Sequence, residues 1–216
     1  MLLGATAFGA GFAFVYWGLL TVHSPTAAIL FATVPVMTFL IAAATGLEKF
    51  KPRVLLGALV ALLGVALVFN EQLAANFSIF ALAALFAGAV MAAVSTVVVK
   101  RFPRGHPVAM NAVGMAVGAL ILFAAALLVR EQFRMPTLAQ TWGALSWLVT
   151  SSITAFVLLV WVIYRWTASA ASYSSLLSPL VTFAVASAIA GETISAVFLV
   201  GSVVVLVGVY LGAVRT

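Results

Sequence analysis

The chain divides into eight long apolar runs, and no Asp, Glu, Lys, Arg or His lies deep inside any of them. Its charged residues are 10 Lys and Arg and 4 Asp and Glu, or 6% of the chain, whereas a soluble domain carries about 25%. So few charges cannot keep a surface in water, so the solvent must be lipid, which a helix of about 20 apolar residues can cross. The sequence therefore predicts an all-α integral membrane protein with eight transmembrane helices. They are expected near residues 2–20, 26–46, 53–70, 77–99, 108–129, 142–164, 169–190 and 193–213.

The basic residues are distributed unevenly over the loops between these helices. Numbering the loops alternately places eight basic residues on one side and two on the other. Basic loop residues concentrate on the cytoplasmic side of a membrane. We therefore expect a multi-pass protein of the inner (plasma) membrane with both termini cytoplasmic. The eight are Lys49, Lys51, Arg53, Lys100, Arg101, Arg104, Arg165 and Arg215, and the two are Arg130 and Arg134.

The sequence repeats itself weakly at a spacing of 144 residues. Of the 72 positions that this shift aligns, 17 are identical without a gap. Apolar composition explains many Ala, Leu and Val matches, but not those of Trp, Pro, Glu and Gly. The period holds five helices, an odd number, so the second copy must be inserted upside down, as in secondary transporters. The informative matches are Trp17 with Trp161, Pro35 with Pro179, Glu48 with Glu192, Gly57 with Gly201 and Gly64 with Gly208.

Helices one to three match helices six to eight, whereas helices four and five have no counterpart upstream. The expected architecture is therefore an inverted-repeat bundle with three plus five helices of a five-plus-five design, lacking the first two. Residues 1–76 would form the partial first repeat, and residues 77–216 the complete second repeat.

Each half contains a helix start rich in small residues, then a proline, a Gly-Glu-like segment, and two glycines seven residues apart. In the first half Leu47 separates that glycine from the glutamate. Taken over essentially the whole chain, this pattern resembles the EamA branch of the drug/metabolite transporter superfamily. The segments are Ser24–Ala28, Val34-Pro35, Gly46–Glu48, Gly57 and Gly64, and then Ala168–Ala171, Ser178-Pro179, Gly191-Glu192, Gly201 and Gly208.

The resemblance implies a permease or exporter. Such a protein would move small metabolites or amino-acid-like solutes through a central cavity by alternating access. We expect the cavity to be lined by helices one, two, four, six and seven. The alternative is a truncated, non-transporting family member that acts as a structural or interaction protein.

Polar and aromatic residues of these helices are the candidates for the cavity. Serines and a threonine spaced three and four apart share one face of the seventh helix. Their hydroxyls either wet a cavity wall or bond between helices, at about 0.6 kcal/mol each. The aromatic residues line the cavity or belong to an interfacial belt, and the prolines form a hinge or a fixed kink. The candidates are Tyr16, Trp17, Thr33, Pro35, Thr38, Ser95, Thr154, Trp161, Ser175, Ser178, Pro179 and Thr182, with Asn111 as a weaker one.

Glu48 and Glu192 are expected at the starts of the third and eighth helices. A carboxylate there is stabilised by the helix dipole by about 0.3–1 kcal/mol, so both are predicted helix caps. Coupling to a proton or cation is the alternative. The repeated glycines predict close helix packing, and a homodimer through such a face is their alternative use.

Several kinds of chemistry have no support in the sequence. There is no Cys, no P-loop or Rossmann glycine motif, and no nucleophile with a base or cluster of metal ligands. We therefore expect no enzyme activity, no catalytic residue, no metal and no cofactor. The net charge of +6 forms no basic face, so nucleic acid is not an expected partner. A small-molecule substrate and membrane lipids are.

Overall fold

The computed structural model describes residues 1–22, 24–69, 78–102, 105–132, 135–181 and 195–214, and every regular element within these ranges is a helix. Each of the eight predicted transmembrane segments contains helix, so the predicted fold class is confirmed. In chain order the elements are the π-helical η1 (Gly4–Gly11), α1 (Phe12–Leu19), α2 (Ser24–Phe31), α3 (Val34–Ala44), α4 (Pro52–Val68), α5 (Ile79–Arg101), α6 (Pro107–Leu128), α7 (Ala139–Arg165), α8 (Ala168–Ser172), a helix over 174–181, α10 (Ala196–Val209) and the π-helical η3 (Tyr210–Val214).

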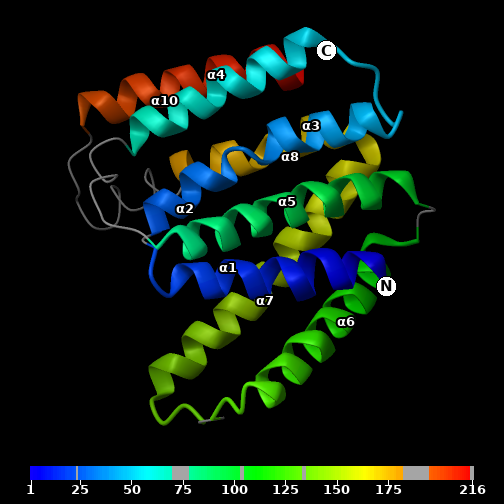
Figure 1. Ribbon diagram of the computed structural model, residues 1–216, viewed down its shortest axis with the longest axis vertical. Helices are drawn as coiled ribbons and strands as arrows, with labels where there is room; N and C mark the ends of the chain where they lie inside the picture. The colour runs from blue at the N-terminus through cyan, green and yellow to red at the C-terminus, as the bar shows by residue number, and fades with distance from the viewer. Residues whose placement is uncertain (23, 70–77, 103–104, 133–134, 182–194, 215–216) are drawn as a thin grey trace.

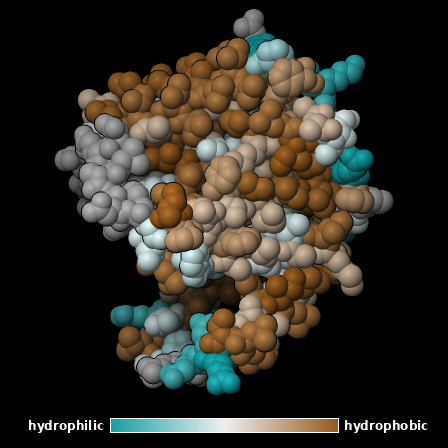
Figure 2. All heavy atoms as spheres, viewed as in Figure 1, coloured by the Kyte–Doolittle hydropathy of each residue, from teal (hydrophilic) through white to brown (hydrophobic). Residues whose placement is uncertain are grey.

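Within the described ranges, five helical segments are long and apolar enough to cross a membrane. The third predicted segment, α4, is apolar but shorter. The first is built from η1 and α1 together, and the seventh is described as far as residue 181. Hydrophobic side chains cover most of the visible surface, as lipid contact requires (Figure 2). The five segments are Thr26–Ala44, Ile79–Arg101, Pro107–Leu128, Ala139–Arg165 and Ala196–Ala213.

The helices form a bundle in which the start of η1 and the end of η3 lie at the same end (Figure 1). We call this the terminal end. The pair α4 and α10 forms one side of the bundle, followed by α2 and α3 with α8, then α5, and then η1 and α1 (Figure 1). Helices α6 and α7 diverge from the bundle away from the terminal end (Figure 1). The first half of α7 is correspondingly exposed over residues 139–150.

The contact between α4 and α10 depends on the repeated glycines. A Cβ atom added to Gly57 would lie 2.7 Å from the Gly208 oxygen, and one added to Gly64 would lie 2.8 Å from the Gly201 oxygen. The backbones therefore touch, as small residues allow in membranes. At the 144-residue spacing Gly57 corresponds to Gly201 and Gly64 to Gly208, so the two contacts exchange equivalent residues. A twofold axis produces this reciprocal pattern.

These contacts account for the glycines within the chain. Gly114 and Gly118 likewise pack closely against Phe8 of η1. The glycine pattern therefore gives the predicted homodimer no separate support, because packing inside one chain explains it.

The second predicted transmembrane segment breaks between α2 and α3, at Ala32 and Thr33. Pro35 then lies in the first turn of α3, where a missing N–H costs nothing. In the second half the break comes at Tyr173, whereas Pro179 lies six residues later, inside the 174–181 helix. The two prolines therefore stand at different distances from the breaks.

Tyr173 fixes its break in the core of the molecule. Its hydroxyl donates to the Val54 carbonyl at 2.7 Å, and its ring packs in a buried cluster with Phe39, Val65 and Val205. The cluster joins α3, α4 and α10 to the segment after α8, and so places the start of the seventh segment against the first half.

Candidate functional site

A cavity of about 250 Å³ lies between η1, α1, α2, α3, α5, α7 and the segment formed by α8 and the 174–181 helix. These elements belong to the first, second, fourth, sixth and seventh predicted transmembrane helices. No charged side chain is among the described residues that line it. We call this space the central cavity.

One part of its wall is aromatic. The rings of Phe12, Phe31 and Phe156 line the cavity, and the centroids of Phe12 and Phe156 are 6.0 Å apart. Phe12 and Phe156 correspond at the 144-residue spacing. A residue that meets its own counterpart lies next to a twofold axis, so the inferred axis passes close to the cavity.

The polar part of the wall consists of hydroxyl groups. Each hydroxyl donates its hydrogen to a carbonyl three or four residues earlier in its own chain segment, at 2.7 to 2.9 Å. A hydroxyl has one hydrogen but two lone pairs, so these groups can still accept hydrogen bonds. The five hydroxyls are those of Ser95, Thr96, Ser172, Ser174 and Ser175.

A small chamber of about 30 Å³ lies beside the central cavity and shares Ser95, Thr96 and Phe156 with it. Asn111 of α6 also lines the chamber and is only 2% exposed. Its Nδ2 donates to the carbonyls of Pro107 and Phe156, at 3.0 and 3.1 Å. Its Oδ1 is buried and has no hydrogen-bond partner.

Among the predicted cavity candidates, Ser95 and Ser175 line the central cavity. Thr33 and Pro35 flank Val34, which also lines it. The Thr33 hydroxyl donates to the Leu30 carbonyl at 2.5 Å. Thr38 is fully buried one turn further along α3, and its hydroxyl has no partner.

Other candidates lie away from the cavity. Ser178 is exposed and Pro179 is half-buried, one turn beyond the lining serines. Thr154 is exposed on α7 and donates to the Thr150 carbonyl at 2.9 Å. Trp161 is 44% exposed, and the Arg165 guanidinium lies 4.0 Å from its ring centroid. Thr182 and Glu192 are outside the described residues.

Tyr16 and Trp17 line a different space. They face an open groove of about 960 Å³ between α1, α5 and α6, with Glu131 at its rim, which we call the outer groove. Both side chains are more than half exposed, at 60% and 54%. The molecule is visibly hollowed between the bundle and the diverging α6–α7 end (Figure 2). The structure thus separates these aromatic residues from the central cavity.

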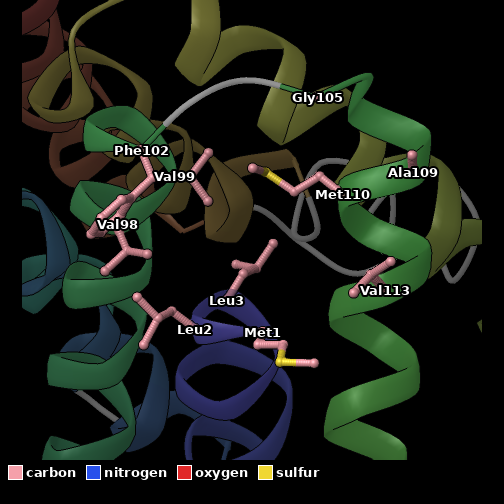
Figure 3. Close-up of a pocket in the computed structure, with 10 residues that line it drawn as sticks. All are labelled: Met1, Leu2, Leu3, Val98, Val99, Phe102, Gly105, Ala109, Met110 and Val113. Atoms are coloured by element: carbon pink, nitrogen blue, oxygen red, sulfur yellow. The ribbon is translucent and has the colours of Figure 1, made fainter.

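A third space, of about 410 Å³, lies at the terminal end between the first residues of the chain, α5 and α6 (Figure 3). Its walls include Met1, Leu3, Phe102 and Met110, and none of its ten lining residues has a charged or hydrogen-bonding side chain apart from the weakly accepting methionine sulfurs. Specific ligand sites need a few placed polar groups. The side chains of this space lack them and offer apolar contact.

Glu48 lies in the loop before α4, but it caps a different helix. Its carboxylate accepts hydrogen bonds from the Ser169 N–H at 3.0 Å and the Ser169 hydroxyl at 2.6 Å, in the first turn of α8. Close by, Arg101 Nη1 donates to the Thr45 carbonyl at 2.9 Å. Both contacts connect residues 1–76 with residues 77–216 at the terminal end.

Asn111 is the polar residue near the cavity that the sequence indicated least clearly. The only signal was an amide in the middle of an apolar run, since the other asparagines, Asn70 and Asn76, lie between runs. The described residues contain no group of three or more His, Cys, Asp or Glu that could hold a metal ion.

Comparisons with known proteins agree with this architecture. A family model described as the EamA-like transporter family matches residues 1–70 and 79–213. A solved crystal structure is similar with a TM-score of 0.81 and 20% sequence identity, over 99% of this chain and 76% of that chain. At this identity the likeness shows a shared fold. No curated protein gives a significant match.

Proposed function

We propose a cargo and a path for this chain, which belongs to the EamA-like transporter family and is thus a multi-pass membrane transporter of the drug/metabolite transporter superfamily. The proposed cargo is a small uncharged, zwitterionic or mildly hydrophobic metabolite, and the proposed path is the central cavity. The observation that carries this proposal is the composition of the cavity wall. Helices from both halves contribute, aromatic rings and hydroxyls face the space, and no charged side chain is among its described lining residues. Pumps and proton relays commonly place charged groups inside the membrane, so coupling through a charged group in this wall has no support.

The proposed mechanism is alternating access, with the two halves rocking against each other. The reciprocal contacts of α4 with α10 support it, because a closely packed pair beside a twofold axis can serve as a pivot. The contacts of Glu48 with Ser169 and of Arg101 with Thr45 bridge the halves at the terminal end. Opening the cavity toward that end would require these bridges to separate.

The proposed orientation follows from charge. Within the described ranges, six basic residues lie at the terminal end and Arg130 lies at the other. The positive-inside rule therefore favours cytoplasmic termini in an inner membrane. The six are Lys49, Lys51, Arg53, Lys100, Arg101 and Arg165.

Counterflow uptake into liposomes with a panel of radiolabelled neutral and zwitterionic metabolites tests the proposal. The decisive variant is Ala92→Phe, which places a ring in the central cavity. Its control is Ala87→Phe, because Ala87 lies on the same helix, is equally half-buried, and faces the outer groove. We expect Ala92→Phe to abolish counterflow and Ala87→Phe to retain most of it.

Equal counterflow in both variants would place the transport path outside the central cavity. Absence of uptake by the folded wild-type protein for every solute would favour the alternative, a non-transporting structural or interaction protein.

A further inference from the structure

We infer that the central cavity selects solutes with a primary amine or ammonium group, which donates hydrogen bonds to acceptor atoms around Asn111. The inference rests on the proposed function, and it names the chemical class of the cargo. The inference follows from the hydrogen bonds of the polar lining groups, whose hydrogens are already donated to carbonyl oxygens of the protein.

Asn111 supplies the first acceptor. Its amide orientation is fixed because Nδ2 donates to two carbonyl oxygens, and a flipped amide would bring Oδ1 against both of them. The partnerless Oδ1 is therefore a buried acceptor on a residue that lines the chamber of about 30 Å³. Buried polar atoms are nearly always paired, so an orphan beside a ligand cavity marks a place for a donor.

The hydroxyls of Ser95 and Thr96 face the same chamber. Both have already given their hydrogen to the Ala92 carbonyl, at 2.8 and 2.9 Å. They offer lone pairs to a ligand and no hydrogen. The three serine hydroxyls on the opposite wall of the cavity are occupied in the same way.

Pro179 adds to this pattern. A proline has no N–H for the carbonyl four residues earlier. For Pro179 that carbonyl belongs to Ser175, which lies in the same helix and lines the central cavity. Pro179 thus leaves the carbonyl of a lining residue without its usual helical donor.

A wall of acceptors suits an ammonium group and disfavours a carboxylate or phosphate, which need donors. The rings of Phe12 and Phe156 lie in the same wall, and aromatic faces attract cations. The remaining cavity, about 250 Å³, holds the apolar body of a small solute. An amine with an apolar body therefore matches both parts of the site.

Binding of three probes to the purified full chain tests the inference by equilibrium dialysis at pH 7. The probes are 2-phenylethylamine, its trimethylammonium analogue, which keeps the charge without an N–H, and phenylacetate, which only accepts. Hydrogen bonds to a charged group correspond to about a tenfold or greater change in affinity. We expect 2-phenylethylamine to bind at least about tenfold more tightly than either other probe.

The matched variants are Ser95→Ala combined with Thr96→Val, and Asn111→Leu, with Ser202→Ala as the control. Ser202 also donates to its own helix, at 2.7 Å, and lies on α10 away from the cavity. We expect the first two variants to reduce the preference for the amine to about threefold or less and the control to keep it. Thermal unfolding separates loss of binding from loss of fold for Asn111→Leu, and the hydroxyl variant provides the test if that protein is unfolded.

Equal binding of all three probes, or tighter binding of phenylacetate, would overturn the inference. The proposed function would then stand for a solute of another chemical class. Amine binding that requires Na⁺, with a probe preference insensitive to the variants, would also overturn it, because an ion would then occupy the acceptors. Variant-sensitive amine binding without counterflow would support the inference while the proposed function fails.

Discussion

At the residue scale, Glu48 is one of the side chains that link the two halves. Its carboxylate accepts two hydrogen bonds from Ser169 at the start of α8, where the helix dipole favours a negative charge. Hydrogen bonds to charged groups contribute about 1.5–3 kcal/mol. We expect Glu48→Ala to lower the free energy of unfolding by about that amount and Glu48→Gln to lower it by about half as much, measured by thermal unfolding in detergent.

Lys49→Ala is the control for this prediction, because Lys49 is exposed beside Glu48 and such surface changes stay within about 0.5 kcal/mol. A double-mutant cycle with Ser169→Ala measures the coupling itself. Ser169→Ala removes the hydroxyl and keeps the backbone N–H, so strictly additive effects of the two substitutions would show that the bond between the hydroxyl and the carboxylate does not contribute.

The role of a residue could be predicted from the sequence better than its hydrogen-bond partner or the space that it faces. The sequence indicated that Glu48 caps a helix, but its partner lies 121 residues away and could only be seen in the fold. Trp17 and Phe12 belong to the same apolar run, yet one faces the outer groove and the other the central cavity. Every face of such a helix is apolar, so periodicity does not distinguish lipid from cavity.

At the element scale, the backbones of α4 and α10 touch. A Cβ atom on Gly64 would lie 2.6 Å from the Val205 nitrogen and 2.8 Å from the Gly201 oxygen, and backbone atoms cannot move aside cheaply. We expect Gly64→Ala to destabilise the protein by about 1–3 kcal/mol, as overpacking does, and Gly64→Leu by more. Thermal unfolding in detergent measures both.

Gly143 gives the matched control for this prediction. It lies in α7 with no atom within 4 Å of an added Cβ, and alanine is favoured over glycine inside a helix. Gly143→Ala is therefore expected to be neutral or slightly stabilising. A Gly64→Ala protein as stable as the wild type would contradict the close packing of α4 and α10.

The positions of the helices could be predicted from the apolar runs, but the positions of the two helix breaks could be predicted only in part. Pro35 marks the break between α2 and α3 closely, because proline belongs in a first turn. The break at Tyr173 has no local signal, since neither Gly nor Pro is near it. A buried tertiary contact fixes it there, namely the hydrogen bond from Tyr173 to the Val54 carbonyl.

At the scale of the whole molecule, the repeat predicted from sequence agrees with contacts that no single helix explains. The equivalent residues Phe12 and Phe156 meet beside the central cavity, and the repeated glycines meet reciprocally between α4 and α10. The spacing of 144 residues indicated that the halves correspond, but not how deeply α6 and α7 are covered. Their divergence from the bundle depends on packing that apolar composition leaves undetermined.

Alternating access predicts that a crosslink between the two halves at the terminal end stops transport. The chain contains no Cys, so paired substitutions Glu48→Cys and Ser169→Cys can be joined by a short, reducible thiol crosslinker without background. We expect joining to abolish counterflow and reduction to restore it, because the two positions belong to different halves. The control pair is Met110→Cys with Tyr164→Cys, whose side chains meet at 3.2 Å within residues 77–216. Rocking of the halves would tolerate the Met110–Tyr164 crosslink, because it lies within one half. Equal inhibition by both crosslinks would therefore argue against rigid-body rocking. Transport by the protein crosslinked between positions 48 and 169 would place the moving gate elsewhere.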